Sequence, residues 1–150
     1  MNNAFVRRFD RNIIHCLKKI SVPTARIVIF IVFFWFGILK VLGTSPADPL
    51  VSKLLSKTLP FITFQQFIIF FGIFEMAIGI IFLIPKWERI AIVLLFLHIV
   101  TTIIPLILLP TTTWQSAFVP TLEGQYIIKN LAIIALAIGI ASHIKPFNKS

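Results

Sequence analysis

The sequence predicts an all-α integral membrane protein: a bundle of four transmembrane helices, preceded by a basic amphipathic segment. Of the 150 residues, 58% are hydrophobic and 13% are charged, and the mean hydropathy is +0.99. A soluble domain of this length carries roughly 25% charged residues, and much of its surface stays exposed to water. Four apolar stretches, at about 25–43, 64–84, 90–109 and 125–142, approach the roughly 20 residues that a helix needs to cross a bilayer.

Lysine and arginine are distributed unequally between the two sides of these spans. One side carries ten of them, in the N-terminal segment, the connection between the second and third spans, and the C-terminus: Arg7, Arg8, Arg11, Lys18, Lys19, Arg26, Lys86, Arg89, Lys145 and Lys149. The other side carries only Lys53 and Lys57, and the connection 110–124 has none. Because cytoplasmic connections of membrane proteins are enriched in basic residues, both termini are predicted to be cytoplasmic.

The first 22 residues form a segment separate from the transmembrane domain, which we place at 23–144. Between Phe5 and Ile20, apolar and basic residues alternate at nearly helical spacing. Such a helix can lie on an anionic membrane surface, and the alternative is a solvated, partly ordered tail. Pro23 is predicted to separate the segment from the first span, because proline interrupts a helix.

The first span, 25–43, is predicted to be a retained transmembrane helix and not a cleaved signal peptide. The apolar stretch of this span begins farther from the N-terminus than the apolar region of a signal peptide does. The span also contains the charged residue Lys40. Residues 45–60, between the first and second spans, are predicted to form a short amphipathic helix across the outer mouth of the bundle. Asp48 is expected to cap this helix, with Pro49 at its first position.

Four ionisable residues lie within the spans: Lys40, Glu75, His98 and Lys129. A charge near the middle of a membrane costs about 2.5–3.5 kcal/mol, so such residues usually face the bundle interior or a partner. At a rise of 1.5 Å per residue, Glu75 and His98 are expected at similar depths, with both lysines nearer the outer face. These depths predict that Lys40, Glu75 and Lys129 form a Lys–Glu–Lys cluster, with His98 close by.

Other polar residues share helix faces with these four. Thr101 and Thr102 follow His98 on its face, and Gln125 and Asn130 accompany Lys129 in the fourth span. We interpret these four as ligand-binding candidates beside the two lysines, with Glu75 and His98 as catalytic candidates that handle protons. Simpler readings remain open. Either lysine can extend to the membrane interface, and His98 can be a core histidine bonded to a carbonyl.

Several function classes fit the sequence poorly. The charge of +9 comes without a basic stripe interleaved with exposed aromatic residues, so no nucleic-acid partner is expected. Cys16 is the only cysteine, which excludes a thiol–disulfide exchanger based on a CxxC motif. No clustered zinc ligands are evident, and His15 and His143 lie too far from His98 for paired haem ligation. No cofactor is therefore evident from the residues themselves.

Three motifs resemble the DoxX-like family of small four-helix membrane proteins, including its YkgB-like branch. They are Phe34–Lys40 (FWFGILK), Gly72–Glu75 (GIFE) followed by Gly79, and Glu123–Asn130 (EGQYIIKN). The resemblance covers about residues 26–142. It implies a four-helix bundle with a polar site formed by Lys40, Glu75 and Lys129, in the inner membrane of a bacterium. Members of the family are linked to quinone oxidoreductases as small membrane subunits, and related proteins act as chaperones or transport accessories.

Two functional hypotheses follow. In the first, the chain is a membrane subunit or accessory of a quinone-linked oxidoreductase, with an outer-facing polar site for a quinone or a small anion. Besides the lipid bilayer, its partner would be an oxidoreductase subunit or a second copy of the chain. In the second, the chain is a non-catalytic binding, assembly or chaperone-like protein whose polar cluster holds the helices together. Fold alone does not decide between them.

Overall fold

The computed structural model describes residues 3–144 and 146, and almost all regular structure in them is helical. Four segments are long and apolar enough to cross a membrane: Val6–Val41, Phe64–Leu83, Glu88–Leu108 and Leu122–Ala141. The predicted helical bundle is thus confirmed as an architecture of four helices with the length and hydropathy that a membrane span needs. Lys145 and Lys149, which contribute to the predicted orientation, lie outside the described residues.

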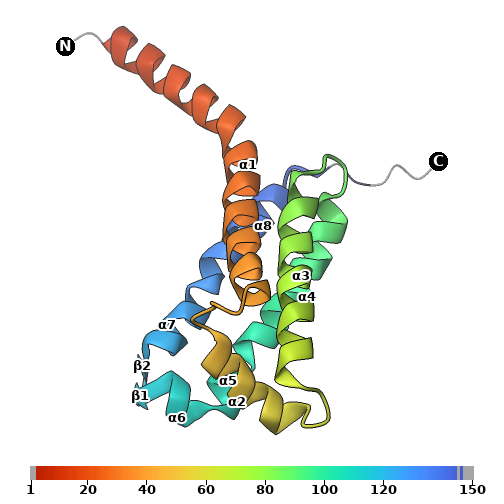
Figure 1. Ribbon diagram of the computed structural model, residues 1–150. Helices are drawn as coiled ribbons and strands as arrows, with labels where there is room; N and C mark the ends of the chain where they lie inside the picture. The colour runs from red at the N-terminus through yellow and green to blue at the C-terminus, as the bar shows by residue number, and fades with distance from the viewer. Residues whose placement is uncertain (1–2, 145, 147–150) are drawn as a thin grey trace.

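The long helices close into a ring. Helix α1 (Asn3–Val41) packs against α3 (Phe64–Leu83) and α8 (Asn130–Ala141), and α4 (Glu88–Ile103) contacts the same two helices. Figure 1 shows the start of α1, the end of α8 and the turn between α3 and α4 at one end of the bundle, which we call the terminal end. The connections that remain gather at the opposite end.

This opposite end is covered by short elements. Helix α2 (Asp48–Thr58) lies across it and contacts α5 (Pro105–Leu108), which in turn contacts α6 (Pro110–Thr113). A small antiparallel hairpin of β1 (Trp114–Ser116) and β2 (Val119–Pro120) precedes α7 (Leu122–Ile128). The Lys57 ammonium donates to the Leu108 carbonyl at 2.8 Å, and this hydrogen bond ties α2 to α5.

An apolar core fills the half of the bundle next to the terminal end. Ten buried side chains from all four long helices form it: Ala25, Ile29, Phe33, Ile78, Phe82, Ala91, Leu95, Ile99, Ala137 and Ile140. Outside the core, large apolar side chains such as Phe70, Val93 and Ile107 are more than half exposed. A surface this apolar is stable against lipid and not against water.

The predicted break in the helix at Pro23 is wrong. Helix α1 is a single helix of 39 residues, and Pro23 lies inside it. Proline removes one backbone hydrogen bond and commonly bends a helix without ending it. In Figure 1 the first part of α1 leans away from the bundle, which accommodates such a bend. The N-terminal segment and the first span therefore share one bent helix.

Three local expectations also change. Ala47 and not Asp48 occupies the N-cap of α2, so Asp48 is the first helical residue. The third span is divided into α4 and α5 before Pro105, whose missing N–H interrupts the helical hydrogen bonds. The fourth span is divided into α7 and α8 at Lys129, where the Ala132 N–H bonds to the Lys129 carbonyl three residues back.

Candidate functional site

The site is built on the closest helix contact in the bundle, between α1 and α3. A Cβ atom added to Gly37 would lie 2.5 Å from the Gly72 carbonyl oxygen, and one added to Gly72 would lie 2.6 Å from the Gly37 oxygen. Only glycine allows two helix backbones to touch in this way. Lys40 and Glu75 each follow one of these glycines by three residues, so both side chains project from the contact.

Lys40 and Glu75 form a buried ion pair there. The Lys40 Nζ donates to Glu75 Oε2 at 2.6 Å, and each side chain is only 7% exposed. A lysine and a glutamate buried in a membrane are costly unless they are paired, so each supplies the partner that the other needs. The pair joins α1 to α3.

His98 brings a third helix to this pair. Its Nε2 lies 3.5 Å from Glu75 Oε1, and its side chain is 5% exposed. The carboxylate faces Nε2, so the tautomer with its hydrogen on Nε2 suits this geometry. The other ring nitrogen, Nδ1, is buried and has no hydrogen-bond partner among the described residues. We call these residues the Lys40–Glu75–His98 cluster.

Phenylalanine rings surround the His98 imidazole. Phe71 stacks on it with a centroid distance of 5.0 Å, Phe33 meets it edge-on at 5.1 Å, and Phe74 lies at 6.3 Å. The Lys40 Nζ also lies 5.6 Å from the Phe71 ring centroid. These rings keep water from the cluster. Sequence reasoning missed all three, because nothing distinguishes them among 16 phenylalanines.

The predicted Lys–Glu–Lys arrangement is wrong in its third member. Lys129 is exposed, and its Nζ lies 4.9 Å from the centroid of the Tyr126 ring. The reason is local: the fourth span is divided at Lys129, and this residue faces outward. The positive charge beside Glu75 comes from Lys40, and His98 lies close to Glu75 as expected.

The remaining candidates divide between helix contacts and the surface. The Thr101 and Thr102 hydroxyls donate to the carbonyls of His98 and Ile99, three residues back on the same helix. The Asn130 amide donates to Thr102 Oγ1 at 3.5 Å and so links α8 to α4. Gln125 is exposed. The structure thus gives these residues contacts outside the cluster.

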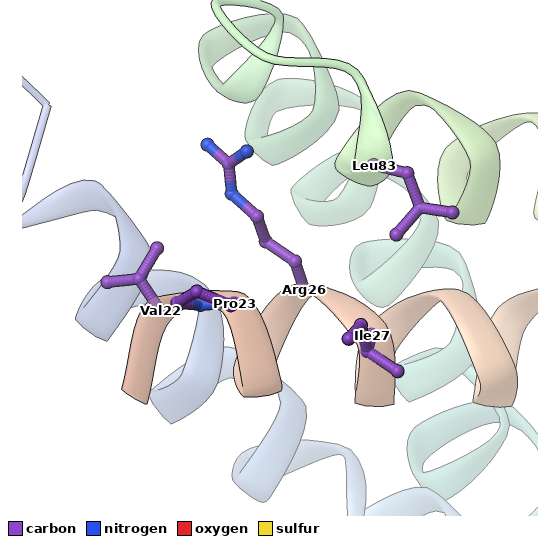
Figure 2. Close-up of a pocket in the computed structure, with 5 residues that line it drawn as sticks. All are labelled: Val22, Pro23, Arg26, Ile27 and Leu83. Atoms are coloured by element: carbon purple, nitrogen blue, oxygen red, sulfur yellow. The ribbon is translucent and has the colours of Figure 1, made fainter. Parts of the chain in front are cut away.

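A second ion pair lies at the terminal end, where the Arg26 guanidinium contacts the Glu88 carboxylate. Arg26 also lines an open hollow of about 270 Å³ together with Val22, Pro23, Ile27 and Leu83, and Figure 2 draws these five side chains. None of these residues belongs to the Lys40–Glu75–His98 cluster. Within the described part of the chain, no group of three or more His, Cys, Asp or Glu residues is placed to hold a metal ion.

The cluster offers three chemical functions in one water-poor place: a positive charge, a carboxylate and an imidazole nitrogen that no described residue hydrogen-bonds. Buried hydrogen-bonding atoms without a partner are rare in folded proteins. No known family model, curated protein or solved structure matches this chain. The resemblance to the DoxX-like family therefore stays a prediction.

Proposed function

We propose that this chain is a small membrane subunit or accessory of a quinone-linked oxidoreductase in the inner membrane of a bacterium, with both termini cytoplasmic. Its ligand site in this proposal is the Lys40–Glu75–His98 cluster, which takes up the reduced, hydroxyl-bearing form of a quinone. Residue motifs like those of the DoxX-like family support the class of protein. The geometry of His98 supports the ligand.

The observation that carries the proposal is the buried His98 Nδ1, which has no hydrogen-bond partner among the residues that the structure describes. With the hydrogen on Nε2, Nδ1 offers a lone pair and accepts a hydrogen bond from a hydroxyl. A quinol hydroxyl supplies such a donor, and its ring suits the surrounding phenylalanines. Leaving Nδ1 unsatisfied costs about 1–3 kcal/mol, so binding a donor there is favoured by a similar amount.

In this proposal the cluster handles protons and a partner handles electrons. Oxidation of a quinol to a quinone releases two protons and two electrons. His98 and Glu75 are the groups that accept protons, and Lys40 keeps a compensating positive charge beside them. The chain has no cysteine pair or flavin fingerprint in its sequence, so the electrons pass to an oxidoreductase subunit that accepts them.

The test starts from quinones that purify with the protein. Organic extraction of the detergent-purified chain, followed by mass spectrometry, is expected to recover bound quinone. His98→Gln keeps an amide donor for Glu75 and removes the imidazole Nδ1. Retained quinone should then fall about tenfold, because one buried hydrogen bond contributes about 1–3 kcal/mol. His143→Gln, at an exposed histidine of the terminal end, is the matched control and should retain quinone.

A second function stays in competition because the three side chains come from three helices and are at most 7% exposed. A closed cluster of this kind suits a non-catalytic assembly or chaperone-like protein, in which the charges hold α1, α3 and α4 together. That reading predicts no quinone in the wild-type extract and no rise in melting temperature on adding a short-chain quinol. It also predicts that His98→Gln unfolds well below the wild-type temperature. This combination of results would reject the quinone site.

A further inference from the structure

The first part of α1 lies largely outside the bundle, and only its end, at Leu17, Ile20 and Ser21, comes near α8 at Leu136. We call residues 6–21 the N-terminal arm; every one of them is exposed. Six large apolar side chains of the arm are 42–60% exposed: Val6, Phe9, Ile13, Ile14, Leu17 and Ile20. Leaving so much apolar surface in water is unfavourable, at roughly 25 cal/mol per Å². The arm therefore needs something to cover it.

Most apolar and basic residues of the arm lie on two opposite faces. At 3.6 residues per turn, Phe9, Ile20, Ile13, Val6 and Leu17 fall within an arc of about 80°. The opposite arc, of about 120°, holds the basic residues Arg7, Arg8, Arg11, Lys18 and Lys19 together with His15. Asp10 is the only acidic residue of the arm. Ile14 is the one large apolar side chain outside the apolar arc.

The position of the arm brings this apolar face to a membrane. The apolar helical segment Val6–Val41 has 36 residues, well beyond the roughly 20 that cross a bilayer, so its basic first part, the arm, extends from the bilayer surface. Pro23 lies inside α1, and Figure 1 shows the arm leaning sideways from the axis of the bundle instead of continuing along it. A helix that leaves the membrane at an angle can rest its length on the surface beside the bundle.

The positive charge of the arm determines which type of lipid surface it binds. A helix that lies in the interface buries its apolar face at the level of the headgroups, while basic side chains reach anionic lipid. Each basic residue near an anionic leaflet contributes about 1 kcal/mol, or roughly fivefold in the binding equilibrium. Five basic residues against one acidic residue give strong complementarity to such a leaflet. A second copy of the arm would bring the same positive charge and no complementary acidic face.

We infer that the N-terminal arm is an amphipathic anchor that binds the anionic lipid surface at the terminal end of the bundle. Its apolar arc, centred on Ile13, faces the acyl chains, and its basic arc faces the phosphate groups and the water. This role is independent of the quinone site. It holds α1 at a fixed angle to the membrane and leaves the transmembrane bundle unchanged.

Spin labels on the full-length protein test this arrangement. In a Cys16→Ser background, one label is placed at Ile13→Cys, in the apolar arc, and its matched control at His15→Cys, in the basic arc. The protein is reconstituted in nanodiscs containing equal amounts of phosphatidylcholine and phosphatidylglycerol. The label at 13 should collide more with oxygen than with a water-soluble nickel chelate, and the label at 15 should show the reverse.

Lipid charge is the second variable. In nanodiscs of phosphatidylcholine alone, the contrast between positions 13 and 15 should weaken. The contrast between positions 13 and 15 should also weaken in the mixed lipid when four basic residues of the arm are changed to Gln: Arg7, Arg8, Lys18 and Lys19. Equal accessibility at both positions in the mixed lipid would show a solvated arm and overturn the inference. Dipolar coupling between labels at position 13 of two copies would overturn it as well, because it would show that the arms pair with each other.

Discussion

At the scale of single residues, the molecule depends on the pairing of Lys40 with Glu75. Each charge stands within a membrane span and is nearly inaccessible to water. Removing one member of a buried pair commonly costs about 3–5 kcal/mol, because the other is left without a counter-charge. Replacing both members with neutral groups costs less, since no charge then remains buried.

A double-mutant cycle measures this pairing. Glu75→Gln should lower the free energy of unfolding by about 3–5 kcal/mol. Combining it with Lys40→Met should recover part of that loss, giving an interaction energy within the roughly 0.5–3 kcal/mol known for contacting residues. Unfolding of the purified protein by denaturing detergent, followed by circular dichroism, gives these values. Lys129→Met is the matched control: Lys129 is exposed, so its effect should add to that of Glu75→Gln within about 0.5 kcal/mol.

Depth along the helices allowed all three members of the Lys40–Glu75–His98 cluster to be predicted from the sequence, together with Lys129, which the structure leaves outside it. Counting residues from the terminal end placed Glu75 and His98 at one level, and the structure joins them. The same counting could not give the direction in which Lys129 points, because that depends on the division of the fourth span at this residue. The three phenylalanines around His98 could not be predicted for a different reason. A phenylalanine inside a bundle and one that faces lipid cannot be told apart in a sequence.

At the scale of the helices, two glycines decide how closely α1 approaches α3. Gly37→Ala and Gly72→Ala each place a Cβ against a backbone oxygen of the facing helix. Backbone cannot move aside as a flexible side chain can, so each change should destabilise the protein by about 1–3 kcal/mol. Gly139→Ala is the control, because nothing lies within 4 Å of its added Cβ. Chemical denaturation of the three variants should leave Gly139→Ala at or above wild-type stability; a loss equal to that of Gly72→Ala would contradict the close contact.

The four helices could be predicted from the sequence, whereas the places where they bend or are interrupted could not be predicted as well. Length and hydropathy located all four spans, because the bilayer demands about 20 apolar residues whatever the packing. The interruptions depend on local hydrogen bonding. Pro105 ends α4, whereas Pro23 bends α1 and leaves the helix unbroken. The difference depends on whether the surroundings satisfy the backbone groups that proline leaves free, which hydropathy does not report.

At the scale of the whole molecule, the two ends of the bundle differ in charge. The terminal end carries the arm and the turn between α3 and α4, with Lys86 and Arg89 near that turn. The opposite end carries the hairpin and α2, where Lys53 and Lys57 are the only basic residues. The grouping of the connections at two ends follows from four antiparallel spans. Which end faces the cytoplasm is predicted from the basic residues alone.

Cysteine labelling in intact cells tests this orientation. Ala117→Cys, in the exposed turn of the hairpin and in a Cys16→Ser background, should react with a membrane-impermeant maleimide added from outside. Cys16 of the wild type, exposed on the N-terminal arm, should react only after the cells are opened. The physical reason is the cost of moving the basic arm across the membrane, where each lysine or arginine costs about 2.5–3.5 kcal/mol at the centre. The reverse result, with Cys16 labelled in intact cells and the Ala117→Cys variant protected, would show that the orientation in the membrane is opposite to the predicted one. The N-terminal arm would then face the outer leaflet, and the hairpin and α2 would face the cytoplasm.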